Sequence, residues 1–182
     1  MNTVTGYIIS GRKEVARAMY STMGRFGEAA PVNDNTLCLL LRAKHSPIEE
    51  YRFGFDCYAP ERVHTHVVRH EEIGKYVSSS RPDLTYCKEI VDGHRAFSLT
   101  INAKRLIEIM QLRLCNRAWH ETKALFVAMK NEVMRLDPVV AKFLAPTCCW
   151  YDFCPEHSDK RPSCGYTSSG QFVVDRASIM TN

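Results

Sequence analysis

The sequence predicts an α+β fold, in which a small mixed or antiparallel sheet is packed by helices that include one long helix. In residues 51–58, aromatic and cysteine side chains alternate with polar or small ones, and this period of two is typical of a half-buried strand. From residue 102 to about residue 136, apolar side chains instead keep helical spacing, which predicts the long helix. The sequence contains no internal repeat.

The remaining elements follow from the same periodicities and from turn residues. Strands are expected over residues 3–10 and 96–101, and helices over residues 12–23, 36–43, 60–70 and 137–145. Beyond Ala145 the chain is rich in cysteine and has no clear period. We therefore expect one domain over residues 1–165, followed by a polar C-terminal tail over residues 166–182.

Composition excludes several classes of protein. The chain has 182 residues and a net charge of +4, too mild and too evenly spread for a nucleic-acid-binding surface. It contains no run of about 18 apolar residues that would span a membrane, and residues 1–10 do not form a secretion signal. We therefore expect a cytoplasmic protein whose eight cysteines are reduced thiols, and whose weak positive charge suits a small anionic ligand.

The segment from Arg69 to Arg81 has the composition of a phosphate-binding loop. Two arginines enclose a polar stretch that includes Ser79 and Ser80. Guanidinium forks, hydroxyls and free backbone N–H groups are the groups that hold a phosphate. A solvated polar turn remains the alternative for this segment taken alone.

A polar row is also expected along the long helix. Asn102 and Arg113 are eleven residues apart, so their positions around the helix differ by only about 20°. Arg117 follows one turn later on nearly the same face. Two arginines at this spacing repel each other, which is tolerated where an anion binds between or beside them; a solvated helix face is the alternative.

Several collinear segments resemble the flavin-dependent thymidylate synthases, the ThyX family. The run NAKRLIEIMQLRLCNRAWHE is similar to that family's long helix, and residues 69–79 resemble its Arg-His-Arg signature followed by seven residues and serine. ARAMYS, SPIEEYRFGF and the cysteine-rich LAPTCCWYDFCPEHSDKRPSCG are similar to three further segments of the family. All five occur in the family's order.

The resemblance implies a homotetrameric enzyme that uses FAD. Such enzymes transfer a one-carbon unit from methylenetetrahydrofolate to C5 of dUMP, and NADPH reduces the flavin. In this chemistry flavin hydride and polarisation of the uracil replace a cysteine nucleophile. A related C5 modification, such as hydroxymethylation, remains open.

The resemblance also assigns roles to residues of this chain. Arg113 and Ser79 are the expected catalytic residues. The residues expected to bind dUMP are Arg69, Ser79, Ser80, Arg81, Arg113 and His66. The residues expected to contact FAD are Ser21, His70, Glu71, Asn102, Lys104 and Arg117.

The chain departs from the family pattern at several of these positions. Glu71 replaces the third residue of the signature, an arginine, and Tyr51 occupies the position of a strand histidine that contacts flavin in the family. The segment between Arg81 and Asn102 is also much shorter than the corresponding segment of the family. These departures favour an alternative, a non-catalytic relative that binds a nucleotide or a partner without flavin chemistry.

The cysteines of the C-terminal part allow one further interpretation. Cys148, Cys154 and Cys164 could supply a tetrahedral zinc site together with Cys115 or His157. Their spacing differs from the paired Cys-x-x-Cys pattern, so buried free thiols are the favoured alternative.

Overall fold

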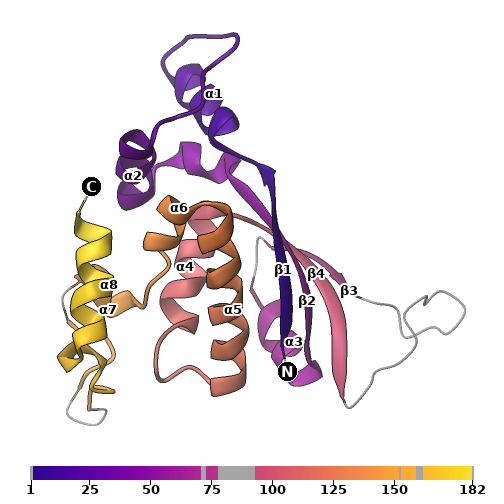
Figure 1. Ribbon diagram of the computed structural model, residues 1–182, viewed down its shortest axis with the longest axis vertical. Coiled ribbons are helices and arrows are strands. Elements are labelled where there is room, and N and C mark those ends of the chain that lie inside the picture. The colour runs from indigo at the N-terminus through magenta and orange to yellow at the C-terminus, as the bar shows by residue number, and fades with distance from the viewer. Residues whose placement is uncertain (1, 71–72, 78–92, 152, 159–161, 182) are drawn as a thin grey trace, which may run out of the picture.

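The core of the fold is a four-stranded antiparallel sheet. The computed structural model describes residues 2–181 apart from 71–72, 78–92, 152 and 159–161. Its strands are β1 (Thr3–Ser10), β2 (Arg52–Pro60), β3 (Gly74–Val77) and β4 (His94–Asn102), in the order β1-β2-β4-β3. This confirms the α+β class and the antiparallel form of the sheet. Figure 1 shows α4 (Ala103–Arg113) and α5 (His120–Leu136) between the sheet and the C-terminal helix α8 (Gly170–Met180).

The alternation of side chains explains why the two central strands form. In β2, Phe53 and Phe55 are fully buried, whereas Arg52 and Asp56 are exposed. In β4 the buried positions are Phe97, Leu99 and Ile101, again every second residue. One face of the sheet therefore packs on the helices, as the period of two predicts.

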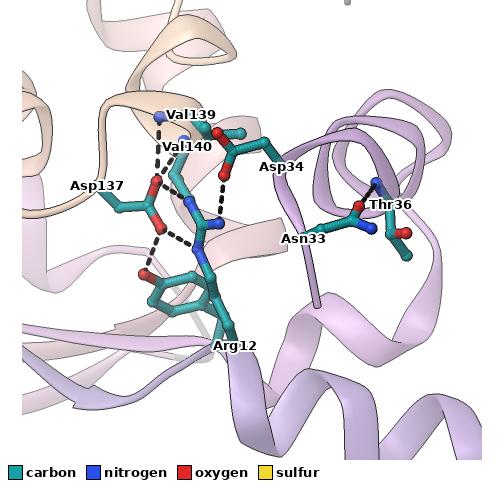
Figure 2. Close-up of polar contacts among 8 residues, drawn as sticks. Arg12, Asn33, Asp34, Thr36, Asp137, Val139 and Val140 are labelled. Carbon is teal, nitrogen blue, oxygen red and sulfur yellow. Dashed lines mark hydrogen bonds and ion pairs between the residues drawn. The ribbon is translucent and has the colours of Figure 1, made fainter. Parts of the chain in front are cut away.

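The N-terminal helices were predicted in the correct places. They are α1 (Arg12–Thr22), α2 (Asp34–Ala43) and α3 (Glu61–Val68), with a 3₁₀ helix η1 (Ser46–Glu50) before β2. At the start of α2, the Asn33 side chain accepts a hydrogen bond from the Thr36 N–H at 2.8 Å (Figure 2). This is the N-terminal capping that asparagine commonly provides.

The long helix predicted over residues 102–136 is wrong as a single element, because it is divided into α4 and α5. The helix stops after Arg113, and Leu114 is its C-cap. The Ala118 N–H then bonds to the Cys115 carbonyl at 3.0 Å, which closes a turn before α5 begins at His120. Cysteine and asparagine at 115 and 116 have low helix propensity, and apolar spacing alone does not register this break.

The C-terminal part is more ordered than the sequence suggested. The helices α6 (Pro138–Lys142) and α7 (Thr147–Tyr151) and a 3₁₀ turn η2 (Tyr166–Ser168) precede α8. The segment expected to be a polar tail thus contains an eleven-residue helix, which buries Phe172 and Ile179. Two apolar residues seven positions apart mark one helical face. None of the helices among the described residues is long and apolar enough to cross a membrane.

One buried carboxylate joins distant parts of the chain. Asp137 is 4% exposed, and both of its oxygens accept hydrogen bonds from Arg12, each at 2.9 Å. The Tyr51 hydroxyl donates to the same carboxylate at 2.7 Å. Asp137 also caps α6 by accepting from the N–H groups of Val139 at 3.0 Å and Val140 at 3.4 Å (Figure 2).

These bonds keep the Asp137 carboxyl ionised. Burial alone raises its pKa, but the hydrogen bonds from Arg12 and Tyr51 outweigh burial, so the pKa lies below the ordinary aspartate value. The same carboxylate, together with burial, raises the pKa of the Tyr51 hydroxyl. We name this set of residues, Arg12, Tyr51 and Asp137, the Asp137 cluster.

Replacing Asp137 by alanine is expected to lower the free energy of unfolding by about 3 kcal/mol or more, because Arg12 and the start of α6 lose their partner together. Tyr51→Phe removes one hydrogen bond to a charged group and should cost only about 1.5 to 3 kcal/mol. Urea denaturation followed by circular dichroism measures both. An Asp137→Ala variant no less stable than Tyr51→Phe would contradict the central role of this carboxylate.

Candidate functional site

The start of α4 is held in place by two capping interactions. The Asn102 side chain accepts a hydrogen bond from the Arg105 N–H at 2.8 Å, and the Ala103 N–H donates to the Tyr51 carbonyl at 2.7 Å. Asn102 is the last residue of β4. The sheet therefore continues directly into α4, and the N-terminus of the helix is fixed against Tyr51, the residue between η1 and β2.

A polar cavity of about 480 Å³ lies beside this helix start. It is lined by Glu49, Asn102, Lys104, Arg105 and Glu108. Lys104 pairs with Glu49 at 2.7 Å, and Arg105 pairs with Glu108 at 3.0 Å. The positive and negative side chains of the wall are thus balanced, and the cavity offers both donors and acceptors.

The opposite end of α4 carries the second part of the site. Arg113 is the last residue of α4, and its Nε donates a hydrogen bond to Nε2 of His70 at 3.0 Å. His70 lies two residues beyond the end of α3, where its N–H bonds to the Val67 carbonyl at 3.1 Å. The fold therefore joins the predicted signature loop to the predicted helix through two side chains.

The His70 imidazole is surrounded by positive charge. Burial lowers its pKa to about 4, and the nearby cations of Arg113, Arg105 and Lys75 lower it in the same direction. Burial also lowers the pKa of the Arg113 guanidinium. At neutral pH the pair therefore consists of a neutral imidazole and a charged guanidinium, since an arginine remains protonated.

Two of these cations were not singled out from the sequence. Arg105 lines the cavity and also acts on His70, so it links the two parts of the site. Lys75 reaches the same imidazole from β3, where its partner in the sheet register is Leu99. Arg105 lies eight residues before Arg113, about 80° away around the helix. This spacing is the sequence feature that could have indicated a cation near the face of Arg113. No comparable pattern marks Lys75.

Part of the predicted phosphate loop can be placed. Arg69 is the C-cap of α3 and is exposed, next to His70 in the chain. The predicted residues Glu71, Ser79, Ser80 and Arg81 lie outside the described residues. Their assignment to the nucleotide and flavin stays a prediction.

Other predicted site residues lie away from the pair. The Ser21 hydroxyl donates to the Arg17 carbonyl of its own helix at 2.9 Å. The His66 ring bonds to the Thr122 hydroxyl at 3.0 Å and lies 5.0 Å from the Trp119 ring, so it packs α3 against the start of α5.

Arg117 does not share the face of Arg113, because α4 ends between them. Its guanidinium instead donates to the Pro162 carbonyl in the cysteine-rich segment. The expected row of Asn102, Arg113 and Arg117 on one helix is therefore corrected. Asn102 is the N-cap of α4 and Arg113 is its last residue, whereas Arg117 belongs to the turn that follows the helix.

Tyr51 explains one departure from the family pattern. Its side chain is 2% exposed and its hydroxyl bonds to Asp137. The residue that replaces the flavin-contacting histidine thus belongs to the Asp137 cluster, where it stabilises the fold.

The four cysteines considered for zinc come from separate segments but meet around one small cavity. Cys115, Cys148, Cys154 and Cys164 all line a space of about 30 Å³. Burial raises the pKa of the Cys115 and Cys148 thiols. Among the described residues, however, no group of three or more His, Cys, Asp or Glu has an arrangement that could hold a metal ion. The zinc interpretation is therefore not supported.

The cavity fits part of a flavin. Asn102, Lys104 and Arg105 supply donors of the kind that contact the carbonyls of an isoalloxazine ring. Glu49 and Glu108 balance the two cations, so this wall does not favour a diphosphate. Residues outside the cavity would have to bind that end of FAD.

Comparisons with known proteins point to the family that the sequence motifs resemble. No family model matches the chain. A stretch of 50 residues is 40% identical to a flavin-dependent thymidylate synthase from Sulfolobus acidocaldarius, and it covers 28% of this chain and 19% of that synthase. The match therefore spans about a fifth of the synthase's length.

A crystal structure of the UMP/dUMP methylase PolB from Streptomyces cacaoi, bound with 5-Br dUMP, has a similar fold. The TM-score is 0.61 with 14% sequence identity, over 79% of this chain and 94% of PolB. The chain therefore shares its fold with this methylase and, over one stretch of 50 residues, resembles a flavin-dependent thymidylate synthase in sequence. Both findings support the resemblance read from the motifs.

The His70 pKa predicts how stability depends on pH. Unfolded His70 binds a proton near its ordinary pKa of about 6.5, whereas folded His70 does so only near pH 4. Between these values the unfolded state binds more protons, so stability falls as the pH falls. The urea midpoint should therefore drop less between about pH 7 and about pH 5 in His70→Gln, which lacks this titration, than in the wild type. Equal drops would show that His70 titrates normally.

Proposed function

We propose that this protein binds dUMP or a closely related pyrimidine nucleotide and modifies C5 of its base by flavin-dependent one-carbon transfer. The observation that carries the proposal is the hydrogen bond between Arg113 and His70. It brings together residues from the two segments that resemble the ThyX signature and the ThyX helix. The partial identity with a flavin-dependent thymidylate synthase and the fold shared with a UMP/dUMP methylase support the same class of reaction.

Arg113 is suited to bind the nucleotide. Its Nε is used by His70, and in the part of the chain that the structure describes no carboxylate pairs with its guanidinium. The two terminal nitrogens can therefore donate together to a uracil carbonyl or a phosphate. Arg69, exposed next to His70, would add a second guanidinium, and Ser79, Ser80 and Arg81 are proposed to complete this subsite.

The cavity beside α4 is proposed to hold the flavin. When bound and reduced, FAD would supply the hydride that the one-carbon transfer requires. Asn102, Lys104 and Arg105 would orient its ring through hydrogen bonds. NADPH as the reductant, methylenetetrahydrofolate as the donor and a homotetramer with shared sites are proposed from the family resemblance. Ser21 and Arg117, which lie apart from the cavity within one chain, would contribute only in such an assembly.

A second candidate is a nucleotide-binding relative without flavin chemistry. Both cations of the cavity wall are already paired with carboxylates, and Tyr51 is buried in the Asp137 cluster. In this candidate these carboxylates keep Lys104 and Arg105 from a flavin, while the Arg113–His70 pair stays available to a nucleotide. The two candidates therefore differ in cofactor binding and agree on the nucleotide.

Arg113→Ala is expected to abolish measurable dUMP binding, a loss of about 100-fold or more, because two hydrogen bonds from a charged group disappear. Isothermal titration calorimetry measures the affinity, and circular dichroism checks that the fold is retained. Arg135→Ala is the matched control. It removes the same charge near the end of α5, where Arg135 contacts Gly6 and Glu132, and should leave the affinity unchanged. Equal affinities of the wild type and Arg113→Ala would refute the assigned role.

The flavin chemistry is tested by absorbance. The enzyme proposal expects purified protein to bind FAD, with the flavin absorbance bleached when NADPH is added under anaerobic conditions. Incubation with dUMP and methylenetetrahydrofolate should then add one carbon to the nucleotide, detected by mass spectrometry. A protein that binds dUMP but neither binds FAD nor forms product would establish the second candidate instead.

A further inference from the structure

We infer that His70 is the positioning residue for Arg113, and that it acts through Nε2 as a neutral hydrogen-bond acceptor. The inference rests on the proposed function and assigns to His70 a role other than direct contact with flavin. It starts from one contact, in which Arg113 Nε donates to His70 Nε2 at 3.0 Å.

The direction of this hydrogen bond determines the state of the imidazole. Arginine has donors and no acceptor, so Nε2 must carry a lone pair. A protonated imidazole would place an N–H against the Nε–H of Arg113, and two donors cannot bond to each other. The proton of the neutral ring is therefore on Nδ1. Burial and the cations of Arg113, Arg105 and Lys75 lower the pKa of this ring, so they oppose its protonation.

An acceptor of this kind orients the guanidinium without neutralising it. A carboxylate partner would hold Arg113 as firmly but would cancel the charge that attracts an anionic ligand. The same chain uses a carboxylate where the cation is structural, as in Arg12–Asp137. At Arg113 it uses a neutral ring, which leaves the two terminal nitrogens and the full charge for the nucleotide.

The geometry of the bond also restricts the arginine side chain. A long flexible side chain loses about 2 kcal/mol of rotamer entropy when it is immobilised. Fixing Nε before the ligand binds removes part of that cost from binding, which is preorganisation. His70 is itself held near the end of α3 by its backbone bond to Val67, so the acceptor is presented from a fixed position.

Two substitutions separate this role from a merely structural one. A glutamine can place its amide oxygen where Nε2 lies, whereas the shorter asparagine reaches only the position of Nδ1. His70→Gln should therefore keep the affinity for dUMP within about threefold of the wild type, and His70→Asn should weaken it about tenfold, as expected for the loss of one hydrogen bond. Isothermal titration calorimetry on the full chain measures both. Equal affinities of the two variants would overturn the inference.

Nuclear magnetic resonance tests the positioning independently of nucleotide binding. The Nε–H resonance of Arg113, assigned by its loss in Arg113→Lys, should be protected from exchange in the wild type and in His70→Gln, but not in His70→Asn. Identical protection in all three proteins would refute the positioning role. If the wild type binds no dUMP while this pattern holds, the proposed nucleotide function fails and the positioning of Arg113 stands.

A double-mutant cycle gives the last criterion. Arg113→Lys keeps the charge but has no guanidinium Nε–H to donate to the imidazole. In that background His70→Asn should cause no further loss of dUMP affinity. A loss as large as in the wild-type background would mean that His70 acts on the nucleotide directly and would contradict the inference.

Discussion

The buried carboxylate of Asp137 is the constraint on which the arrangement of the fold depends. Its partners come from the start of α1, from the junction of η1 and β2, and from α6, so one side chain fixes three distant parts of the chain relative to each other. A buried charge without partners costs several kcal/mol. Each partner therefore stabilises the position of the others. If any of these segments separated, the Asp137 carboxylate would be exposed to solvent or would stay buried without a partner.

This constraint extends to the site through Tyr51. Its hydroxyl bonds to Asp137, and its carbonyl accepts the N–H of Ala103, the first residue of α4. From there α4 runs eleven residues, about 16 Å, to Arg113. The end of a rigid helix follows the position of its start, so the contact between Arg113 and His70 depends on a hydrogen bond at the opposite end of α4.

The sequence predicts those features that depend on local periodicity. It fails where a helix end is only weakly marked and where the structure depends on contacts between distant residues. The alternation around Phe53 and Phe55 identified β2, and Asp-Pro at 137–138 identified the start of α6. The break after Arg113 was missed because the apolar spacing continues across it, while the residues that end the helix are only moderately unfavourable. The burial of Phe172 depends on packing against distant residues. The contact between His70 and Arg113 joins residues 43 apart, and only the family resemblance placed both of them at one site.

The distribution of carboxylates distinguishes a structural cation, Arg12, from Arg113, the cation proposed to bind the nucleotide. Arg12 is paired with the buried Asp137, and this pair joins the start of α1 to the start of α6. Arg113 is partly buried, and burial lowers its pKa, yet among the described residues its only polar partner is a neutral ring. Burying a guanidinium without a counter-charge destabilises the folded chain. An anionic group that pairs with Arg113 relieves this cost. Desolvation of Arg113 therefore destabilises the free protein locally, and it strengthens the binding of a phosphate or a polarised uracil carbonyl. The neutral acceptor at His70 leaves the desolvation cost of Arg113 to be relieved by the ligand. A carboxylate in its place would relieve that cost in the free protein, before any ligand bound.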